Sequence, residues 1–158
     1  MGGRIAPDVS YAPISDYPRR AHFDFYRAHP SPFYSVTFEL EATRLRERLA
    51  DERAPVYAGL CWHFHRALLT LPAFRVRLAG DDLVLHDRLR MGLTVPAPRR
   101  TFTFATFEWE PDWAAFAGSA RGVLARASEG IDLSGGKEPD FAYYTALPRI
   151  PFTAFTHV

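Results

Sequence analysis

The stretch "APVYAGLCWHFHRALLTLPAFRVRLAGDDLVLHD", residues 54–87, carries a helix pattern followed directly by a hairpin pattern. Its first half repeats apolar residues at helical spacing, and Pro55 suits a first turn. The residues of this stripe are Tyr57, Leu60, Cys61, Phe64 and Leu68. Its second half predicts two strands, FRVRL and LVLHD, joined by a turn that contains glycine and acidic residues. A chain that combines such a helix with a hairpin belongs to a mixed α and β class.

Two other segments show the alternation of apolar and polar residues that is typical of half-buried strands. Residues 33–41, FYSVTFELE, place Val36, Phe38 and Leu40 on one face. Residues 151–157, close to the last residue of the sequence, alternate in the same way. We therefore expect a strand at each place.

The remaining elements complete the expected fold. A short helix is predicted at 43–53, a strand at 101–110, and a helix that begins at Pro111. Strands and helices are intermingled, and no repeat or long linker divides the chain. The expected fold class is α/β (an α+β two-layer arrangement), with a mixed β-sheet flanked by helices on one side, in a single domain spanning 1–158.

Composition excludes several functional classes. The 158 residues are 47% hydrophobic with a net charge of +1, and the basic residues are scattered among acids, so we expect no nucleic-acid partner. No segment approaches the roughly 18 apolar residues of a membrane span, so we expect no membrane association. A single cysteine, Cys61, excludes an internal disulfide framework and agrees with a cytoplasmic location.

Local motifs favour neither a metal site nor a cysteine nucleophile. His63 and His65 are two positions apart, which turns them about 200° from each other on a helix, whereas a helical zinc pair needs a spacing of four. Cys61 lies on the apolar stripe, where a buried thiol behaves as a small hydrophobic residue. We expect no metal cofactor.

The segment "YPRRAHFDFYR", residues 17–27, resembles the start of the chloramphenicol acetyltransferase family: an aromatic residue, two arginines, and a His-Phe-acid-Phe-Tyr-like run. The resemblance continues in order along the chain, as far as Phe155. The matching segments are "FYSVTFELEATRLRERL" (33–49), "PAFRVRLAGDDLVLHD" (72–87), "RTFTFATFEWEPDWAAF" (100–116) and "TALPRIPFTAF" (145–155).

This resemblance implies an O-acyltransferase that uses acetyl-CoA as co-substrate and a small hydroxylated acceptor. In that family a histidine of a C-terminal His-His-x-x-x-Asp-Gly motif removes the acceptor's hydroxyl proton. The sequence contains no His-His pair and no Asp-Gly. We therefore expect a C-terminally truncated family chain, which is inactive as it stands. We also expect it to fold poorly, because the strand at 151–157 would leave an unpaired edge.

The resemblance also assigns residues to the site. The family's oxyanion-stabilising serine is matched by Ala154, so no catalytic residue is assigned, although Thr156 faces the same side of the expected strand. The positions that line the family's acceptor pocket are Phe25, Tyr26, Phe102 and Phe152, with Phe104 a weaker candidate. Arg19 matches an arginine that braces the site by pairing with the aspartate of the absent motif.

Several alternatives remain open from the sequence, for the site residues and for the function. The aromatic residues of the expected pocket would equally suit a hydrophobic core, and Arg19 would equally suit the surface. The chain is either an incomplete acyltransferase or a non-catalytic relative that binds an apolar aromatic ligand or a partner chain. A dihydrolipoyl-type acyltransferase fits less well, because nothing before Tyr17 resembles a lipoyl domain. A homotrimer is implied by the resemblance alone, and the acceptor cannot be named.

Overall fold

The computed structural model describes residues 9–134, 138–147 and 150–154. In chain order the elements are β1 (Val9–Pro13), α1 (Arg20–Arg27), α2 (Thr43–Asp51), α3 (Val56–Leu69), α4 (Pro72–Arg75), β2 (Val76–Ala79), β3 (Asp82–His86), β4 (Arg90–Ala97), β5 (Thr101–Phe107), α5 (Trp113–Ser128) and β6 (Phe141–Tyr144). Short 3-10 turns occur at Ile14–Asp16 and Pro98–Arg100.

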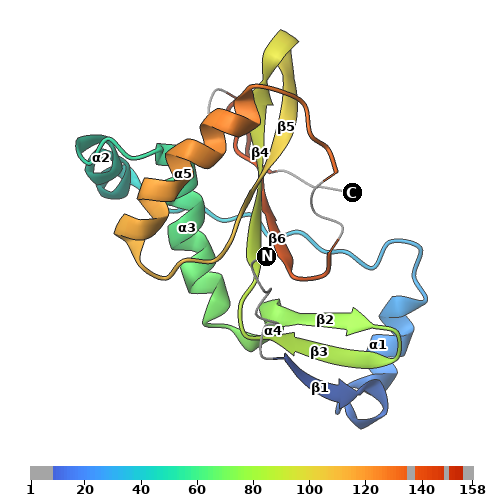
Figure 1. The fold of residues 1–158 in the computed structure, drawn as a ribbon. Coiled ribbons are helices and arrows are strands. Elements are labelled where there is room, and N and C mark those ends of the chain that lie inside the picture. The colour runs from blue at the N-terminus through green and yellow to red at the C-terminus, as the bar shows by residue number, and fades with distance from the viewer. Residues whose placement is uncertain (1–8, 135–137, 148–149, 155–158) are drawn as a thin grey trace, which may run out of the picture.

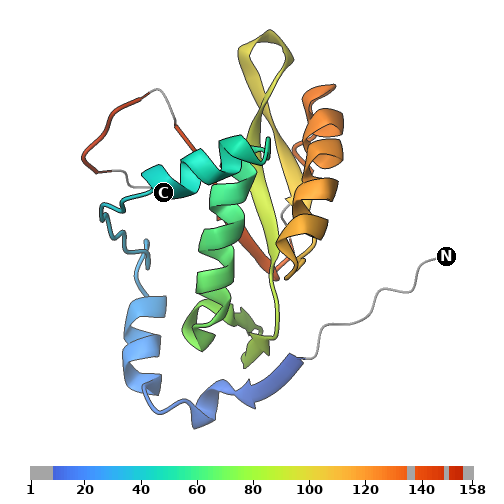
Figure 2. The same ribbon diagram turned by 90° about the vertical axis from the view of Figure 1, so that its left-hand side faces the viewer.

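A mixed three-stranded sheet forms one layer of the fold. Its strand order is β5-β4-β6, with β4 antiparallel to β5 and parallel to β6. Helices α3 and α5 lie on one face of this sheet (Figure 1 and Figure 2). The expected mixed sheet with helices on one side is confirmed.

The hairpin predicted within 74–87 is also confirmed, but it belongs to a second sheet. Strands β2 and β3 pair antiparallel, and β1 adds to the other edge of β3. Gly80 sits in the turn with a positive φ of 63°, a conformation that glycine adopts without steric cost. The first residues of the predicted FRVRL strand, Phe74 and Arg75, lie instead in α4, because Pro72 opens a short helix there.

Arg77 of β2 ties the two sheets together. Its Nε donates to the carbonyl oxygen of Pro139 at 2.7 Å, and its Nη2 donates to that of Phe141 at 2.9 Å. Next to this contact, Arg90 of β4 binds Asp140 through two hydrogen bonds of 2.8 and 2.6 Å. Paired guanidinium and carboxylate groups of this kind fix the start of β6 against β4.

The strand predicted at 33–41 is absent. These residues form neither helix nor strand, and the side chains of Val36, Phe38 and Leu40 are exposed. The alternation of apolar and polar residues indicated which face of a strand would be apolar. A strand also needs a neighbouring strand to pair with its backbone groups. Within the described chain no backbone hydrogen bond reaches residues 33–40.

The strand predicted at 151–157 is not formed over its described part. Residues 151–154 have no strand pairing, and 155–157, including Thr156, lie outside the described residues. The last described strand is β6, which ends at Tyr144. The unpaired edge expected at 151–157 is therefore not a feature of the described structure.

Sequence patterns did not predict β4, although it is the central strand. Met91, Leu93 and Val95 are buried on its helix-facing side, and Gly92 is buried on the other, so the strand lacks a simple alternation. Pro96 is accommodated because β6 pairs only with residues Arg90 to Leu93. Beyond that point β4 has a partner on one side only.

The hydrophobic core lies between this sheet and its two helices. Trp62 of α3 stacks on Trp109 at 5.7 Å between ring centroids and approaches Phe116 of α5 at 6.3 Å. The Trp62 indole N–H donates to the carbonyl of Glu110 at 2.7 Å, which satisfies the ring's polar atom. The other residues buried in this cluster are Ala58, Cys61, Met91, Leu93, Val95, Ala105, Phe107 and Ala120.

A polar chain inside the core joins α3 to β6. The side chain of His65 is fully buried, and its Nε2 lies 2.9 Å from the carbonyl of Leu89. Because a carbonyl only accepts, Nε2 carries the proton, and Nδ1 accepts from the Tyr144 hydroxyl at 2.7 Å. Burial lowers the pKa of His65 to about 4. The histidine is therefore neutral at pH 7.

We predict that stability falls between about pH 6.5 and pH 4. The unfolded chain protonates His65 near its ordinary pKa of about 6.5, whereas the folded chain resists protonation down to about 4. The folded state thus binds fewer protons over this window and loses roughly 3 kcal/mol as the pH falls through it. Urea unfolding at half-unit pH intervals measures this slope.

His65→Gln is the matched variant for this measurement, since glutamine has hydrogen-bonding groups but does not titrate. It should flatten the pH dependence in this window, whereas His63→Gln, at the half-buried neighbouring position, should leave most of it. Equal slopes for the original chain and His65→Gln would contradict the assignment.

Candidate functional site

A hollow beside α1 is the best candidate for a ligand site. Its volume is about 520 Å³, within the range of about 300–1,000 Å³ of ordinary ligand pockets. Its lining residues are Tyr17, Arg19, His22, Phe23, Tyr26, Arg27, Pro32 and Leu78. The hollow therefore combines aromatic rings with basic side chains.

Contacts along α1 set the shape of this lining. Arg20 and Asp24 form an ion pair one turn apart at 2.6 Å on the exposed side of the helix. The rings of Tyr17 and Phe23 meet edge to face with centroids 6.5 Å apart, and the guanidinium of Arg27 lies 5.9 Å from the centre of the Phe23 ring. Helix α1 has no fully buried residue. Its aromatic side is thus ordered by local contacts and remains open to solvent.

Arg19 occupies the N-cap position of α1 and lines the hollow. The residue is exposed, and among the described residues no acidic side chain pairs with it. A solvated guanidinium does not bear the cost that a buried, unpaired one would. Its position leaves the charge available to an anionic or polar group.

The predicted pocket aromatics fall into separate groups. Phe25 and Tyr26 are adjacent on α1, with ring centroids 5.2 Å apart, but of these two only Tyr26 lines the hollow. Phe102 and Phe104 lie on β5, with centroids 5.8 Å apart. No ring contact joins the α1 pair to the β5 pair. Figure 1 and Figure 2 both place α1 at the opposite end of the molecule from the β4–β5 turn.

Phe152 lies in the segment 150–154, where it is exposed, and Ala154 is exposed as well. One chain therefore does not bring Phe25 and Tyr26 of α1 around one concavity with Phe102 of β5. The simple expectation of one shared pocket needs this correction, because α1 lies beside β2 of one sheet, whereas Phe102 lies on β5 of the other. The role of each residue in binding stays a prediction.

Phe102 and Phe104 lie on the face of the sheet that points away from the helices. Their β4 partners are Pro96 and Thr94, whereas the buried residues Thr103 and Ala105 of β5 point to the helix side. On β6, exposed Tyr143 is paired with Gly92, where an added Cβ would lie 3.0 Å from the Tyr143 ring. This second face therefore carries aromatic rings that are partly open to solvent.

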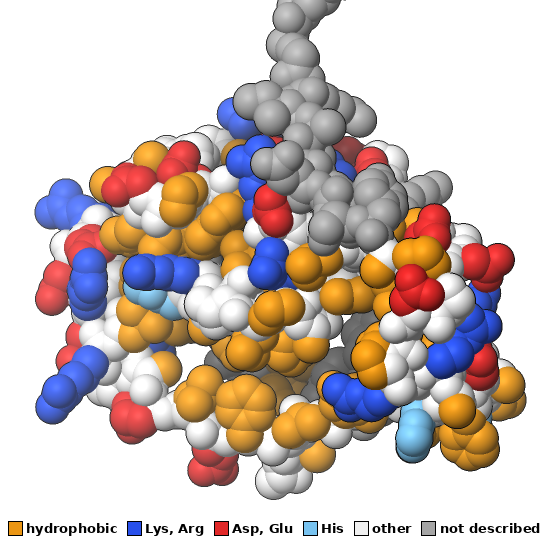
Figure 3. All heavy atoms as spheres, turned by 90° about the horizontal axis from the view of Figure 1, so that it is seen from below, with side chains coloured by type: hydrophobic (Ala, Val, Ile, Leu, Met, Phe, Trp, Pro, Cys, Tyr) orange, Lys and Arg blue, Asp and Glu red, His pale blue; other side chains and the backbone are white. Residues whose placement is uncertain are grey.

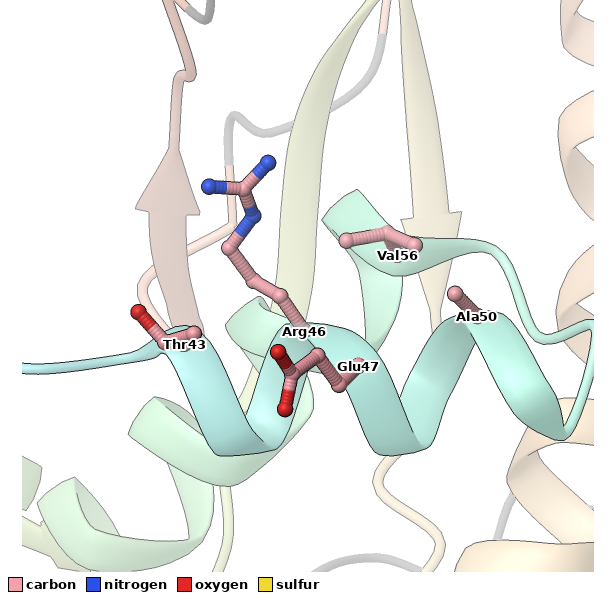
Figure 4. A pocket seen from close by; sticks show the side chains of 5 residues that line it. All are labelled: Thr43, Arg46, Glu47, Ala50 and Val56. Atoms are coloured by element: carbon pink, nitrogen blue, oxygen red, sulfur yellow. The ribbon is translucent and has the colours of Figure 1, made fainter.

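Two further hollows in the described part of the chain, both along α2, carry no predicted site residue. Residues Thr43, Arg46, Glu47 and Ala50 of α2, with Val56, line a hollow of about 350 Å³. Figure 4 shows the Arg46 and Glu47 side chains pointing in different directions, with no aromatic ring among the lining residues.

Seen from below, hydrophobic side chains lie together over the middle of the surface, with charged groups around them (Figure 3).

Candidate chemistry elsewhere is inert or absent among the described residues. Burial raises the pKa of the Cys61 thiol to about 12, so it remains protonated at neutral pH and is a poor nucleophile. In the described ranges no three His, Cys, Asp or Glu side chains gather to hold a metal ion. The helices found there are also too short or too polar to cross a membrane.

The structure also shows a buried polar contact near the site that sequence patterns missed. The link from His65 through Tyr144 to Tyr57 holds β6 against α3, and β6 leads directly to the segment that contains Ala154. Spacing indicated only that His63 and His65 do not form a metal pair. A histidine on an otherwise apolar helix face was the available signal for a buried polar contact.

Comparisons with known proteins agree with this architecture. A family model described as "Chloramphenicol acetyltransferase" matches residues 9–157. The chain is 29% identical to a chloramphenicol acetyltransferase of Streptomyces acrimycini, over 96% of this chain and 71% of the relative. It is 26% identical to chloramphenicol acetyltransferase 2 of Escherichia coli, over 90% of this chain and 68% of the relative.

A solved structure of a chloramphenicol acetyltransferase has the same fold. Its TM-score is 0.84 at 23% identity, over 95% of this chain and 74% of that one. Because the family model covers nearly all of the sequence, the chain belongs to the chloramphenicol acetyltransferase family.

Proposed function

We propose that this chain supplies the acceptor-binding part of an acetyl-CoA-dependent O-acyltransferase. The observation that carries this proposal is the hollow beside α1, in a chain whose family match spans 9–157. Tyr17, Phe23 and Tyr26 provide apolar ring surface, and Arg19 provides a polar anchor. This combination suits a small hydroxylated acceptor with an apolar body.

The proposed reaction transfers an acetyl group. A base takes the acceptor's hydroxyl proton while that oxygen bonds to the thioester carbonyl carbon of acetyl-CoA. Collapse of the tetrahedral intermediate breaks the carbon–sulfur bond, and the protonated base returns the proton to the departing sulfur, which gives the acetyl ester and free coenzyme A thiol. The base in this proposal is the histidine of a His-His-x-x-x-Asp-Gly motif, which the 158 residues do not contain. His65 does not replace it, because both its ring nitrogens are engaged inside the core.

The intermediate's negative oxygen also needs a hydrogen-bond donor. Ala154 stands at the position assigned to that donor, and its methyl group donates no hydrogen bond. Removal of one such donor typically costs about 10²–10³ in kcat. We therefore propose that the chain by itself binds the acceptor but does not turn it over.

A homotrimer with sites between subunits would reconcile the two groups of aromatic residues. Within one chain, Tyr26 on α1 and Phe102 on β5 are held apart, and Phe102 is 48% exposed on the face of the sheet that points away from the helices. A neighbouring copy placed on that face would bring its own α1 toward β5. The proposal includes no nucleic-acid or membrane partner.

A non-catalytic ligand-binding protein is the second candidate. The observation that favours it is Ala154, because the loss of a donor matters for turnover but not for acceptor binding. In that case the α1 hollow would bind an apolar aromatic ligand or a partner chain as its final function.

We predict that the chain alone releases no thiol from acetyl-CoA above background. The measurement uses purified chain with chloramphenicol and a panel of other hydroxylated acceptors. Addition of a segment from a relative that bears His-His-x-x-x-Asp-Gly should produce turnover, because it supplies the base. Robust turnover by the unextended chain that disappears in His22→Gln would contradict the proposal, since His22 lines the hollow.

We also predict that Tyr26→Ala weakens acceptor binding by about tenfold, because the ring supplies apolar contact area in the hollow. Titration calorimetry on the chain measures this change. Tyr26→Phe should retain most of the affinity, and Phe74→Ala, an exposed ring outside the lining, serves as the matched control. Equal affinity of Tyr26→Ala and the unmodified chain would place the acceptor elsewhere.

A further inference from the structure

Strand β6 stands at the end of the strand order β5-β4-β6, and the chain leaves the sheet directly after it. The strand has four residues and lies beside β4 (Figure 1). The last pair of this ladder joins Tyr144 to Leu93, and residues 145–147 belong to neither helix nor strand. Past this pair, the Thr145 hydroxyl hydrogen-bonds to that of Thr94 at 3.1 Å. Side chains therefore take over from the backbone ladder in placing the chain after Tyr144.

Two side chains of α3 hold Tyr144 at this exit. The Tyr57 hydroxyl donates to the backbone carbonyl of Tyr144 at 2.9 Å, and the backbone of Ala146 hydrogen-bonds to the same hydroxyl. His65 lies about two turns further along α3, with its Nδ1 2.7 Å from the Tyr144 hydroxyl oxygen. Tyr144 is thus fixed at its main chain by one residue and at the end of its ring by the other.

The partners of His65 allow one arrangement of hydrogens. Its Nε2 lies 2.9 Å from the Leu89 carbonyl oxygen, so this nitrogen carries the proton and Nδ1 is left to accept. The Tyr144 hydroxyl therefore donates to Nδ1. The Trp109 ring packs against the imidazole, with 5.2 Å between the ring centroids. His65 is thus a fixed acceptor aimed at Tyr144.

Packing alone does not explain a histidine at this position. The side chain is fully buried between α3 and the sheet, where an apolar residue would need no hydrogen-bonding partner. A buried polar network whose members are all satisfied specifies a single arrangement of its side chains. What His65 adds over an apolar residue is therefore a fixed orientation of Tyr144.

We propose that His65 is a positioning residue that acts through Tyr144 on the chain after β6. By holding the Tyr144 hydroxyl, it sets where residues 145–147 leave the sheet and how they lead to the segment 150–154. The consequence for turnover rests on the proposed function, in which that segment belongs to the site. The positioning itself does not depend on it.

Asparagine and glutamine separate the two hydrogen bonds of the imidazole. The amide of asparagine is one carbon closer to the backbone, so His65→Asn offers an acceptor near the place of Nδ1, whereas His65→Gln offers a donor near the place of Nε2. The first variant keeps a partner for the Tyr144 hydroxyl, and the second keeps a partner for the Leu89 carbonyl. Tyr144→Phe removes the hydroxyl and retains the ring.

Nuclear magnetic resonance of the chain alone at pH 7 measures the positioning. His65→Gln and Tyr144→Phe should shift the backbone amide signals of 145–147 in the same way and speed their hydrogen exchange about tenfold. His65→Asn should leave both close to those of the original chain. The nitrogen-15 signals of the His65 ring should show a protonated Nε2. A general loss of stability would instead speed exchange throughout β4, and urea unfolding of each variant measures that loss.

The consequence for turnover is measured on the chain supplied with the His-His-x-x-x-Asp-Gly segment. His65→Gln and Tyr144→Phe should lower kcat about tenfold, because small displacements of site groups slow the chemical step. The KM for the acceptor should stay within twofold, since neither residue lines the α1 hollow. His65→Asn should retain most of kcat, and His63→Gln on the same helix is the matched control.

Three results would overturn the proposal. The first is amide signals of 145–147 that do not change in His65→Gln and Tyr144→Phe. The second is an equal disturbance by His65→Asn and His65→Gln, which would make His65 a packing residue. The third is turnover with an unchanged kcat in His65→Gln and Tyr144→Phe. If the added segment gives no turnover at all, the proposed function fails, and the amide measurement on the chain alone decides the positioning.

Discussion

The structure depends on the burial of one face of β4 and β5 beneath α3 and α5. Trp62 lies at the centre of this contact, stacked on Trp109 and hydrogen-bonded to the carbonyl of Glu110. Removal of such apolar surface from water is the main favourable contribution to folding. The hairpin sheet, α1 and the segment 150–154 contribute no residue to this buried cluster. The candidate site is carried largely by these less buried parts.

The sequence predicted the elements in which apolar residues recur at the period of a helix or a strand that buries one face. Helices α2, α3 and α5, the β2–β3 hairpin and β5 over 101–107 all agree with expectation. Strand β4 escaped prediction because burial on both faces removes the alternation, and Gly92 and Pro96 argue against a strand. For residues 33–41 a strand was predicted that the structure does not contain. Apolar and polar residues alternate there as they do in a strand, but such alternation does not specify a hydrogen-bonding partner.

The candidate site shows the same division. The resemblance indicated Tyr26 and Arg19, which line one hollow, but no sequence pattern could show that Phe102 and Phe104 lie on another sheet, far from α1. The number of residues between two positions in the sequence does not give the distance between two sheets in the folded chain. The buried link between His65 and Tyr144 was equally hidden, because it joins residues 79 positions apart. Together these features describe a buried helix–sheet core with the candidate site residues at its edges.

Hydrogen–deuterium exchange of the purified chain tests this account most directly, because protection of backbone amides reports local unfolding. The account predicts slow exchange in α3, β4 and β5, which surround Trp62, and much faster exchange in α1, which has no buried residue. Exchange of α1 as slow as that of β4, or rapid exchange throughout β4, would contradict the claim that a buried helix–sheet core supports an open site.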